Sequence, residues 1–423
     1  MLGILTIHGG RPLRGTVRIS GAKNAVLPLL AATVVRGGCY RLEHCPRLTD
    51  VAATIDILRH IGCRCTFYAD VIEVDSRSLS CASIPQVLMC RLRSSVIFLG
   101  ALLSRCGQAT LALPGGCPIG KRPIDLHLDA LRQLGAQIIC DGEQVTCRAA
   151  RFHGGTVTLP YPSVGATENI LLAAMSCPDG VTIVNAAREP EVDALADFLS
   201  QMGAEVSGQG SGVLTLRPPG IGKDTDFRIL PDRMEAATYL CALAACGGSI
   251  TLMNIEPQLL LPVLDALAEA GVSIELAEDQ IHARAHGLRG IGYVETAPYP
   301  GFPTDAQAPL MAALLRAEGE SIVKETVFEQ RFRHVQALRS LGADICVQDS
   351  EATVRGVACL RGADMAATDL RGGAAMVIGA LSASGVSHIS QIQHIFRGYE
   401  CLCEKLSGLG AQITLDGESL EDI

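Results

Sequence analysis

The stretch ALRSLGADI, residues 337–345, contains the pattern that decides the fold: a leucine-rich helix, a glycine, and then the alternation typical of a strand. The same pattern occurs six times in the 423 residues. The other copies are ILRHIGCRC (57–65), LRQLGAQII (131–139), FLSQMGAEV (198–206), ALAEAGVSI (266–274) and KLSGLGAQI (405–413). The six glycines are Gly62, Gly135, Gly203, Gly271, Gly342 and Gly410, separated by 73, 68, 68, 71 and 68 residues. Such even spacing predicts a repeated fold of six α/β modules.

Each glycine stands where a helix commonly ends in the left-handed backbone conformation, which glycine adopts without strain. The residues that follow, for example Gln137, Ile138 and Ile139, alternate as in a strand. We therefore expect every module to contain a helix that ends immediately before a strand.

A chain of this length is too long for one hydrophobic core, so six modules predict two domains of three. Between the third and fourth copies, residues 207–226 are rich in Gly, Ser and Pro, and RILPDRMEA (228–236) resembles a crossing between domains. The first strand, ILTIHGG (4–10), could pair with the later domain, so that the chain would cross twice. We expect residues 21–229 in the first domain, residues 1–20 and 230–423 in the second, and the active site in a cleft between them.

The composition excludes several kinds of partner. A content of 4% aromatic residues with no Trp argues against a platform for stacked bases, and a net charge of −9 argues against nucleic acid or anionic membrane. The longest apolar runs, such as residues 236–246, are shorter than the roughly 18 residues that span a bilayer. The N-terminus lacks the pattern of a signal peptide. We therefore expect a soluble cytoplasmic protein with neither a nucleic-acid nor a membrane partner.

The 17 cysteines are scattered along the chain. The closest pairs, Cys63/Cys65 and Cys401/Cys403, are separated by one residue, whereas zinc sites favour two to four. No metal site is therefore expected, and most cysteines are expected to be small buried side chains in a reducing compartment. Cys117 differs from the others because of its surroundings.

Cys117 lies in TLALPGGCPIGKRPIDLH (110–127), where a strand-like run enters a loop rich in Gly and Pro. Lys121 and Arg122 make the setting electropositive, which favours a reactive thiol, although a loop cysteine without a role remains an alternative. Gly115, Gly120 and Lys121 also match most of a phosphate-binding loop. That motif needs Ser or Thr where Arg122 stands, so an ATPase is disfavoured while anion binding by the loop is retained.

Further anion-binding candidates lie at probable element boundaries. Lys23 and Asn24 precede an apolar helix, and helix N-termini bind phosphate and carboxylate groups. Four arginines stand beside apolar runs: Arg93, Arg331, Arg371 and Arg397. Asp305 and Asp369 occupy expected N-cap positions, so helix capping alone could explain them. Solvated lysines and surface arginines are commonplace, but the set together indicates a site for a polyanionic ligand with a thiol acid and a carboxylate base.

The sequence as a whole resembles the UDP-N-acetylglucosamine 1-carboxyvinyltransferase family. The matching motifs, in order, are SGAKNA (20–25), LPGGCPIGKRPIDLH (113–127), NAAREPE (185–191), LPDRMEA (230–236), FPTDAQA (302–308), ETVFEQRFRHV (325–335), ATDLRGGAA (367–375) and IFRGYE (395–400). The resemblance implies an α/β fold: an inside-out α/β barrel of two domains, each with three βαβαββ units. It also implies transfer of the enolpyruvyl group of phosphoenolpyruvate to the 3-hydroxyl of UDP-N-acetylglucosamine, the first committed step of peptidoglycan synthesis.

The resemblance also implies residue roles. Cys117 would be the general acid and could carry a phosphoenolpyruvate thioketal adduct, and Asp305 would take the proton of the sugar hydroxyl. The phosphoenolpyruvate clamp would be Lys23, Arg122 and Arg397. The remaining substrate contacts would be Asn24, Arg93, Pro123, Ile124, Asp125, Leu126, Tyr161, Pro162, Ser163, Val164, Val327, Arg331, Asp369 and Arg371. No metal or organic cofactor is implied.

Two residues depart from the family pattern, which leads us to expect lysines where Thr49 and Tyr161 stand. Their loss could weaken nucleotide binding or shift a contact to Arg47. Three alternatives stay open: 5-enolpyruvylshikimate-3-phosphate synthase, whose GSKS-type and NAGTAMR-type segments we do not find, a phosphate-loop ATPase, and a non-catalytic sugar-nucleotide-binding protein. The retained Cys117 predicts alkylation by fosfomycin, a phosphoenolpyruvate mimic.

Overall fold

A computed structural model describes residues 3–112, 124–142, 144–149, 152–220 and 222–416. The described residues divide into two compact units. We call the residues up to Ser20 together with those from Pro231 onward the terminal unit, and the residues from Gly21 to Leu230 the middle unit. The chain therefore passes between the units at two places, Ser20–Gly21 and Leu230–Pro231. The expected boundaries, 20/21 and 229/230, lie within one residue of these places.

The middle unit contains three of the repeated modules. Its strands are β3 (Cys39–Glu43), β4 (Arg64–Tyr68), β5 (Val71–Asp75), β6 (Ser83–Ile84), β7 (Gln108–Ala112), β8 (Gln137–Asp141), β9 (Gln144–Arg148), β10 (Gly155–Thr158), β11 (Val181–Val184), β12 (Glu205–Ser207), β13 (Val213–Arg217) and β14 (Thr225–Arg228). Its helices are α1 (Lys23–Ala32), α2 (Thr49–His60), α3 (Gln86–Met89), the 3₁₀ helix η1 (Arg93–Ile97), α4 (Phe98–Cys106), α5 (Asp125–Gln133), α6 (Val164–Ala174) and α7 (Pro190–Gln201).

The terminal unit contains the other three modules. Its strands are β1 (Ile4–His8), β2 (Leu13–Arg18), β15 (Gly248–Met253), β16 (Ser273–Leu276), β17 (Gln280–Ala285), β18 (Tyr293–Glu295), β19 (Glu320–Lys324), β20 (Asp344–Gln348), β21 (Glu351–Arg355), β22 (Asp364–Ala366), β23 (Val386–Ser390) and β24 (Gln412–Asp416). Its helices are α8 (Arg233–Cys246), η2 (Pro257–Leu260), α9 (Leu261–Glu269), α10 (Thr304–Ala313), η3 (Leu314–Arg316), α11 (Val335–Ser340), α12 (Leu370–Ser382), η4 (Ile392–His394) and α13 (Leu402–Gly408).

The strands of the described residues form six four-stranded sheets with one shared arrangement. In β10-β11-β13-β12, for example, the first pair is parallel and the other two pairs are antiparallel. Three sheets are completed by strands from distant parts of the chain: β14 pairs with β3, β2 with β15, and β1 with β23 and β24. The first strand, β1, therefore pairs with strands of the later modules, as expected.

The six repeat glycines end six helices in the same way. All have positive φ, between +91° at Gly410 and +105° at Gly203. After α5, the N–H of Gly135 donates to the carbonyl of Arg132 and the N–H of Ala136 donates to that of Leu131. These two bonds define the Schellman motif, and the same pair follows α2, α7, α9, α11 and α13. The prediction of a glycine between each helix and its strand is confirmed.

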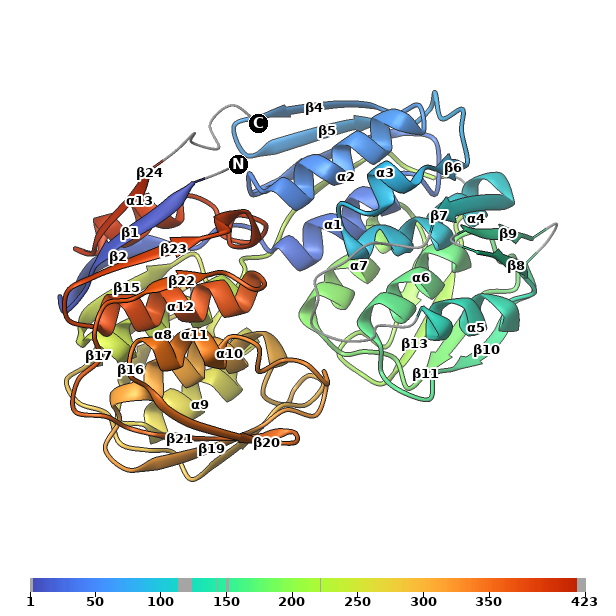
Figure 1. Ribbon diagram of the computed structural model, residues 1–423. Helices are drawn as coiled ribbons and strands as arrows, with labels where there is room; N and C mark the ends of the chain where they lie inside the picture. The colour runs from blue at the N-terminus through green and yellow to red at the C-terminus, as the bar shows by residue number, and fades with distance from the viewer. Residues whose placement is uncertain (1–2, 113–123, 143, 150–151, 221, 417–423) are drawn as a thin grey trace. The chain divides into compact units, whose positions relative to one another are not determined.

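Each unit has its own core, built around helices that are apolar on nearly all sides. In the terminal unit these are α8, α10 and α12, which pack against one another, as Figure 1 shows. In the middle unit α4 packs against both α1 and α6. Strands such as β13, with an alternating burial pattern, place one face on the core and the other in solvent. This is the expected architecture of helices inside and sheets outside.

Two further expectations concern single features. Of the 16 described cysteines, all free thiols, five are buried but five are exposed, so burial as the general account of the cysteines is wrong. The exposed ones are Cys90, Cys106, Cys140, Cys359 and Cys401. Among the residues whose structure is described, no helix combines the length and the apolar character needed to cross a bilayer.

Candidate active site

The candidate residues gather at the N-terminal ends of the buried helices. In the terminal unit, Asp305 is the second residue of α10, and Arg371 is the second residue of α12. In the middle unit, Lys23 is the first residue of α1, Arg93 is the first residue of η1, which leads into α4, and Ser163 caps α6. Helix N-termini present unpaired backbone N–H groups and a partial positive charge. Two helices of the terminal unit and three of the middle unit therefore have a candidate residue at the end of the helix that favours anions.

Asp305 is bound by two arginines. The Nη2 atom of Arg331 lies 2.5 Å from Oδ1 of Asp305, and Nη2 of Arg371 lies 3.1 Å from Oδ2. The side chains of Arg331 and Arg371 are 4% and 3% exposed, whereas that of Asp305 is 29% exposed. Arg331 also donates to the carbonyl of Thr304, which begins α10. The carboxylate is thus fixed from the protein side and remains accessible from the solvent side.

The expected capping roles of the two aspartates have different outcomes. Asp369 is the N-cap of α12: its Oδ1 accepts from the N–H groups of Arg371 and Gly372. Asp305 is not a cap, because Pro303 occupies that position and Asp305 lies within the first turn. That expectation was wrong, since the carboxylate of Asp305 is engaged by the two arginines instead. Helix capping therefore accounts for Asp369 but not for Asp305.

The buried carboxylate of Glu325 orders the loop that contains Val327. Its Oε1 accepts from the N–H groups of Val327 and Phe328 at 2.8 and 3.0 Å. Its Oε2 accepts from the hydroxyl of Thr304 at 2.9 Å. Val327 and the start of α10, which carries Asp305, are consequently held together by one carboxylate.

Two buried N–H groups beside Asp305 lack hydrogen-bond partners among the described residues. They are the Nε groups of Arg331 and Arg371. Buried donors are usually satisfied, so each of these groups leaves a hydrogen bond unmade among the described residues.

In the middle unit, Lys23 is paired with a buried acid. Its Nζ lies 3.3 Å from Oδ2 of Asp50, and the two side chains are 13% and 6% exposed. Asp50 lies in the first turn of α2. The adjacent Asn24 is exposed. Lys23 and Asn24 were expected to precede α1, but they form its first two residues.

Arg93 lies near a histidine that the sequence did not single out. Burial, together with the charge of Arg93, lowers the pKa of His127 to about 4, so the imidazole is neutral near pH 7. Nδ2 of the fully buried Asn169 lies 2.7 Å from Nδ1 of His127. The Asn169 amide also donates to the Val96 carbonyl, while its oxygen accepts from the N–H of Gly100. Because the amide nitrogen donates to Nδ1, the ring proton resides on Nε2.

The other candidates are placed as follows. Asp125 begins α5, with Ile124 as its cap residue and Leu126 next, whereas Tyr161, Pro162 and Ser163 precede α6, which begins at Val164. Arg397 lies between η4 and α13. Cys117, Arg122 and Pro123 lie outside the described residues.

The two departures from the family pattern occupy different settings. Thr49 is the first residue of α2. Tyr161 is 41% exposed. The guanidinium of Arg47, proposed as a substitute cation, lies 4.7 Å from the centre of the Phe67 ring.

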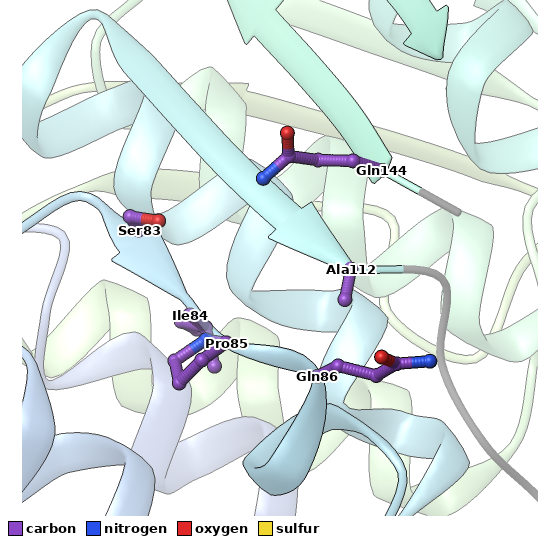
Figure 2. A pocket seen from close by; sticks show the side chains of 6 residues that line it. All are labelled: Ser83, Ile84, Pro85, Gln86, Ala112 and Gln144. Carbon is purple, nitrogen blue, oxygen red and sulfur yellow. The ribbon is translucent and has the colours of Figure 1, made fainter. Parts of the chain in front are cut away.

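A groove of about 380 Å³ lies in the middle unit where β7 ends. Figure 2 shows Gln144 and Gln86 on either side of Ala112, with Ser83 and Pro85 also lining the groove. None of its lining residues was a candidate from the sequence. The described residues that line it carry no charge and offer hydrogen bonds through Gln86, Gln144 and Ser83.

Four residues at these helix ends were missed by sequence reasoning: Asp50, His127, Glu325 and Tyr399. Tyr399 accepts a hydrogen bond from Nη1 of Arg371 at 2.9 Å. His127, Glu325 and Tyr399 stand inside motifs that supported the family resemblance, and Asp50 follows Thr49 directly. Their motif positions were a usable signal, but each acts on another side chain rather than showing a chemistry of its own. Across the described ranges, no three His, Cys, Asp or Glu side chains are grouped so as to hold a metal ion.

Comparison with known proteins gives matches over nearly the whole chain. A family model described as EPSP synthase (3-phosphoshikimate 1-carboxyvinyltransferase) matches residues 7–406. UDP-N-acetylglucosamine 1-carboxyvinyltransferase 2 of Caldanaerobacter subterraneus subsp. tengcongensis is 43% identical over 416 residues, which cover 97% of this chain and 99% of that protein. UDP-N-acetylglucosamine 1-carboxyvinyltransferase of Dichelobacter nodosus is 45% identical over 412 residues, covering 97% and 98%.

Solved structures of enolpyruvyl transferases share this fold. The enolpyruvyl transferase NikO from Streptomyces tendae has a TM-score of 0.88 at 27% identity, covering 98% of this chain and 99% of that one. EPSP synthase from Acinetobacter baumannii has a TM-score of 0.75 at 18% identity, covering 99% and 100%, and supports the fold alone. The chain therefore belongs to the UDP-N-acetylglucosamine 1-carboxyvinyltransferase family, within the enolpyruvyl transferases.

Proposed function

We infer that this protein is a UDP-N-acetylglucosamine 1-carboxyvinyltransferase. It transfers the enolpyruvyl group of phosphoenolpyruvate to the 3-hydroxyl of UDP-N-acetylglucosamine and releases phosphate. The observation that carries this inference is the full-length identity of 43–45% with curated enzymes of that name. The reaction belongs to peptidoglycan synthesis, and its substrates are soluble metabolites, so we place the enzyme in the cytoplasm.

The proposed chemistry is an addition followed by an elimination. Asp305 takes the proton of the 3-hydroxyl as its oxygen attacks C2 of phosphoenolpyruvate, while the thiol of Cys117 gives a proton to the methylene carbon C3. In the elimination, C3 loses a proton, the double bond re-forms, and the C2–O bond to phosphate breaks. In a side reaction the sulfur of Cys117 bonds to C2 while C3 takes the thiol proton, so that the C2–C3 double bond becomes single and phosphoenolpyruvate is held as a thioketal.

The geometry around Asp305 supports its role as the base. Two buried guanidinium groups orient the carboxylate, and its partial exposure leaves it accessible to a substrate. A base must be held within hydrogen-bonding reach of the proton it removes. A third contact, between the Glu325 carboxylate and Thr304, anchors the start of the helix on which Asp305 lies.

Fixed positive charge is proposed to stabilise the tetrahedral intermediate. Lys23 supplies a charge at the N-terminus of α1, and Asp50 holds its ammonium group at 3.3 Å. Arg122 and Arg397 complete the clamp for the phosphate and carboxylate of phosphoenolpyruvate. Preorganised charge of this kind is commonly the largest contribution of an enzyme to the rate.

The sugar nucleotide is proposed to contact residues that begin several helices. Asn24 and Asp305 would hold the sugar, and Arg93, Val327, Arg331, Asp369 and Arg371 would complete the substrate site. The uridine diphosphate contacts would be Arg122, Pro123, Ile124, Asp125, Leu126, Ser163 and Val164, with Tyr161 and Pro162 as further substrate contacts. The capped N-terminus of α6, where the Ser163 hydroxyl accepts from the N–H of Ala166, fits an anionic ligand.

The test is phosphate release from phosphoenolpyruvate with and without UDP-N-acetylglucosamine. We expect release only with the sugar nucleotide, an enolpyruvyl product by mass spectrometry, loss of both in Cys117→Ala, and a strongly reduced but measurable rate in Asp305→Asn. Shikimate 3-phosphate is the control acceptor, and ATP with magnesium is the control for a phosphate-loop ATPase. A wild-type protein that binds UDP-N-acetylglucosamine but releases no phosphate would favour the binding-protein alternative instead.

A further inference from the structure

The hydroxyl of Tyr399 lies in the middle of a buried chain of hydrogen bonds, and one end of this chain is Asp305. Nη2 of Arg371 donates to Oδ2 of Asp305 at 3.1 Å, and Nη1 of the same guanidinium donates to Oη of Tyr399 at 2.9 Å. Oη of Tyr399 lies 2.8 Å from Oγ1 of Thr238. Arg371, Tyr399 and Thr238 are 2%, 1% and 5% exposed.

The direction of every bond in this chain can be deduced. The hydroxyl of Thr238 donates its only proton to the carbonyl of Met234 at 2.9 Å. Between Tyr399 and Thr238, the proton must therefore come from Tyr399. Burial raises the pKa of Tyr399, which keeps this proton in place. All groups then point one way, from Arg371 through Tyr399 and Thr238 to Met234, so that each bond polarises the next.

The chain connects elements that are far apart in sequence. Thr238 belongs to α8, Asp305 to α10 and Arg371 to α12, while Tyr399 lies in the segment between η4 and α13. Both ends of the Arg371 guanidinium are thereby used, one by the base and one by Tyr399. A guanidinium held at two points has a fixed plane, and the fixed plane determines where Oδ2 of Asp305 lies.

We propose that Tyr399 is a positioning residue of the transferase reaction, acting on Asp305 through Arg371. This inference rests on the proposed function, because it presumes that Asp305 is the base. Tyr399 itself is buried behind Arg371 and need not touch the substrate. Its effect should be partial, because Arg331 holds the other oxygen of Asp305 independently.

The chain offers a matched control for removal of the hydroxyl. Tyr239 is also 1% exposed and lies in the same core, but its hydroxyl has no hydrogen-bond partner within the described part of the chain. Tyr239→Phe and Tyr399→Phe are chemically identical changes. They differ in that only the second breaks the bonds to Arg371 and Thr238.

The experiment measures kcat, the KM of both substrates and the thermal midpoint for wild type, Tyr399→Phe, Tyr239→Phe and Thr238→Val. We expect Tyr399→Phe to lower kcat about tenfold, since a base displaced by a fraction of an ångström loses much of its effect. The KM for phosphoenolpyruvate should stay within about twofold. Thr238→Val, which removes the same chain from its far end, should lower kcat less, and Tyr239→Phe should match wild type.

A double-mutant cycle tests whether the effect passes through the base. In an Asp305→Asn background, measured by product formation over long incubations, Tyr399→Phe should cause no further loss. An equal loss in both backgrounds would overturn the proposal. A raised KM for phosphoenolpyruvate at unchanged kcat would also overturn it, because Tyr399 would then serve only the segment that carries Arg397.

The two proposals fail in different ways. A wild-type protein without sugar-nucleotide-dependent phosphate release overturns the proposed function and this inference together. A fully active wild type whose Tyr399→Phe and Thr238→Val variants behave like Tyr239→Phe overturns only the positioning role. If Tyr399→Phe does not fold, Thr238→Val alone decides between the same outcomes, since it removes the acceptor and leaves Tyr399 in place.

Discussion

Nη2 of Arg331 lies 2.5 Å from Oδ1 of Asp305, and this ion pair joins a buried cation to a partly exposed anion. The protein holds the carboxylate from one side, and its other side remains accessible. This arrangement also means that Arg331, which the family resemblance places among the substrate contacts, is already engaged by the proposed base. A change in kcat on substitution of Arg331 should therefore report how well Asp305 is positioned.

We expect Arg331→Met to lower kcat about a hundredfold, because Asp305 loses one of its two guides. The same change should cost about 2 kcal/mol of unfolding free energy, since it disrupts a largely buried ion pair.

The matched control is Arg355→Met. Arg355 also forms an ion pair with a carboxylate, that of Glu320 at 2.8 Å, but its side chain is 51% exposed. It should lose at most about 0.5 kcal/mol and retain full activity, as exposed ion pairs do. Urea unfolding and phosphate release measure both variants, and equal effects would contradict the role of Arg331.

Fosfomycin should alkylate Cys117 in preference to the exposed cysteines. Lys121 and Arg122 lie close to Cys117 in sequence and favour its thiolate. Cys401 is exposed as a residue but has an acidic neighbour instead of basic ones. Partial burial of its sulfur and the Glu404 carboxylate raise the pKa of its thiol to about 11. Peptide mapping after brief exposure should locate the adduct on Cys117, and Cys117→Ala should remain unlabelled. An equal yield at Cys90 or Cys401 would show that exposure, not local charge, governs reactivity.

Stability should decrease with acid through His334. This side chain is fully buried, and burial lowers its pKa from 6.5 to about 4, with Arg331 acting in the same direction and Asp369 against it. Between these values the unfolded chain binds the proton more readily than the folded chain. The stabilising contribution is thus complete above about pH 6.5 and is lost as the pH falls towards 4.

The size of the effect follows from the two pKa values. His334→Gln should unfold with a weaker pH dependence than wild type, the difference reaching about 3 kcal/mol across that window. Denaturant unfolding of both proteins at several pH values between 7 and 4.5 measures it. Parallel curves would remove His334 as the cause.

Gly342→Ala should destabilise the protein through the backbone alone. Gly342 has φ +95°, and a Cβ added there would meet nothing within 4 Å. We expect a cost of about 1 kcal/mol, the penalty for a side chain in the left-handed region. Gly292 is the control, because a Cβ there also meets open space and its φ lies outside that region. Gly292→Ala should be neutral or slightly stabilising. Thermal unfolding compares them, and equal midpoints would contradict the strain argument.

The sequence by itself determined the modules of this protein. Helix ends are local: the N–H groups that close each Schellman motif lie within five residues of their acceptors, so a Gly after a leucine-rich run is enough to predict them. Six copies at even spacing then predicted six α/β modules, to which the family resemblance added the βαβαββ order, and the first strand could be assigned to the later modules. The expectation of a reactive Cys117 likewise rests on its neighbours in the chain.

The tertiary structure decided which groups meet at the site. Asp305 looked like a helix cap because its partners, Arg331 and Arg371, lie 26 and 66 residues away. Tyr399 and Thr238 are 161 residues apart and have no local pattern that links them. Local signals report backbone conformation over a few residues, whereas an ion pair or a hydrogen-bond chain depends on how α8, α10 and α12 pack. Only that packing, driven by burial of their apolar sides, brings the two arginines to Asp305 and the tyrosine to Arg371.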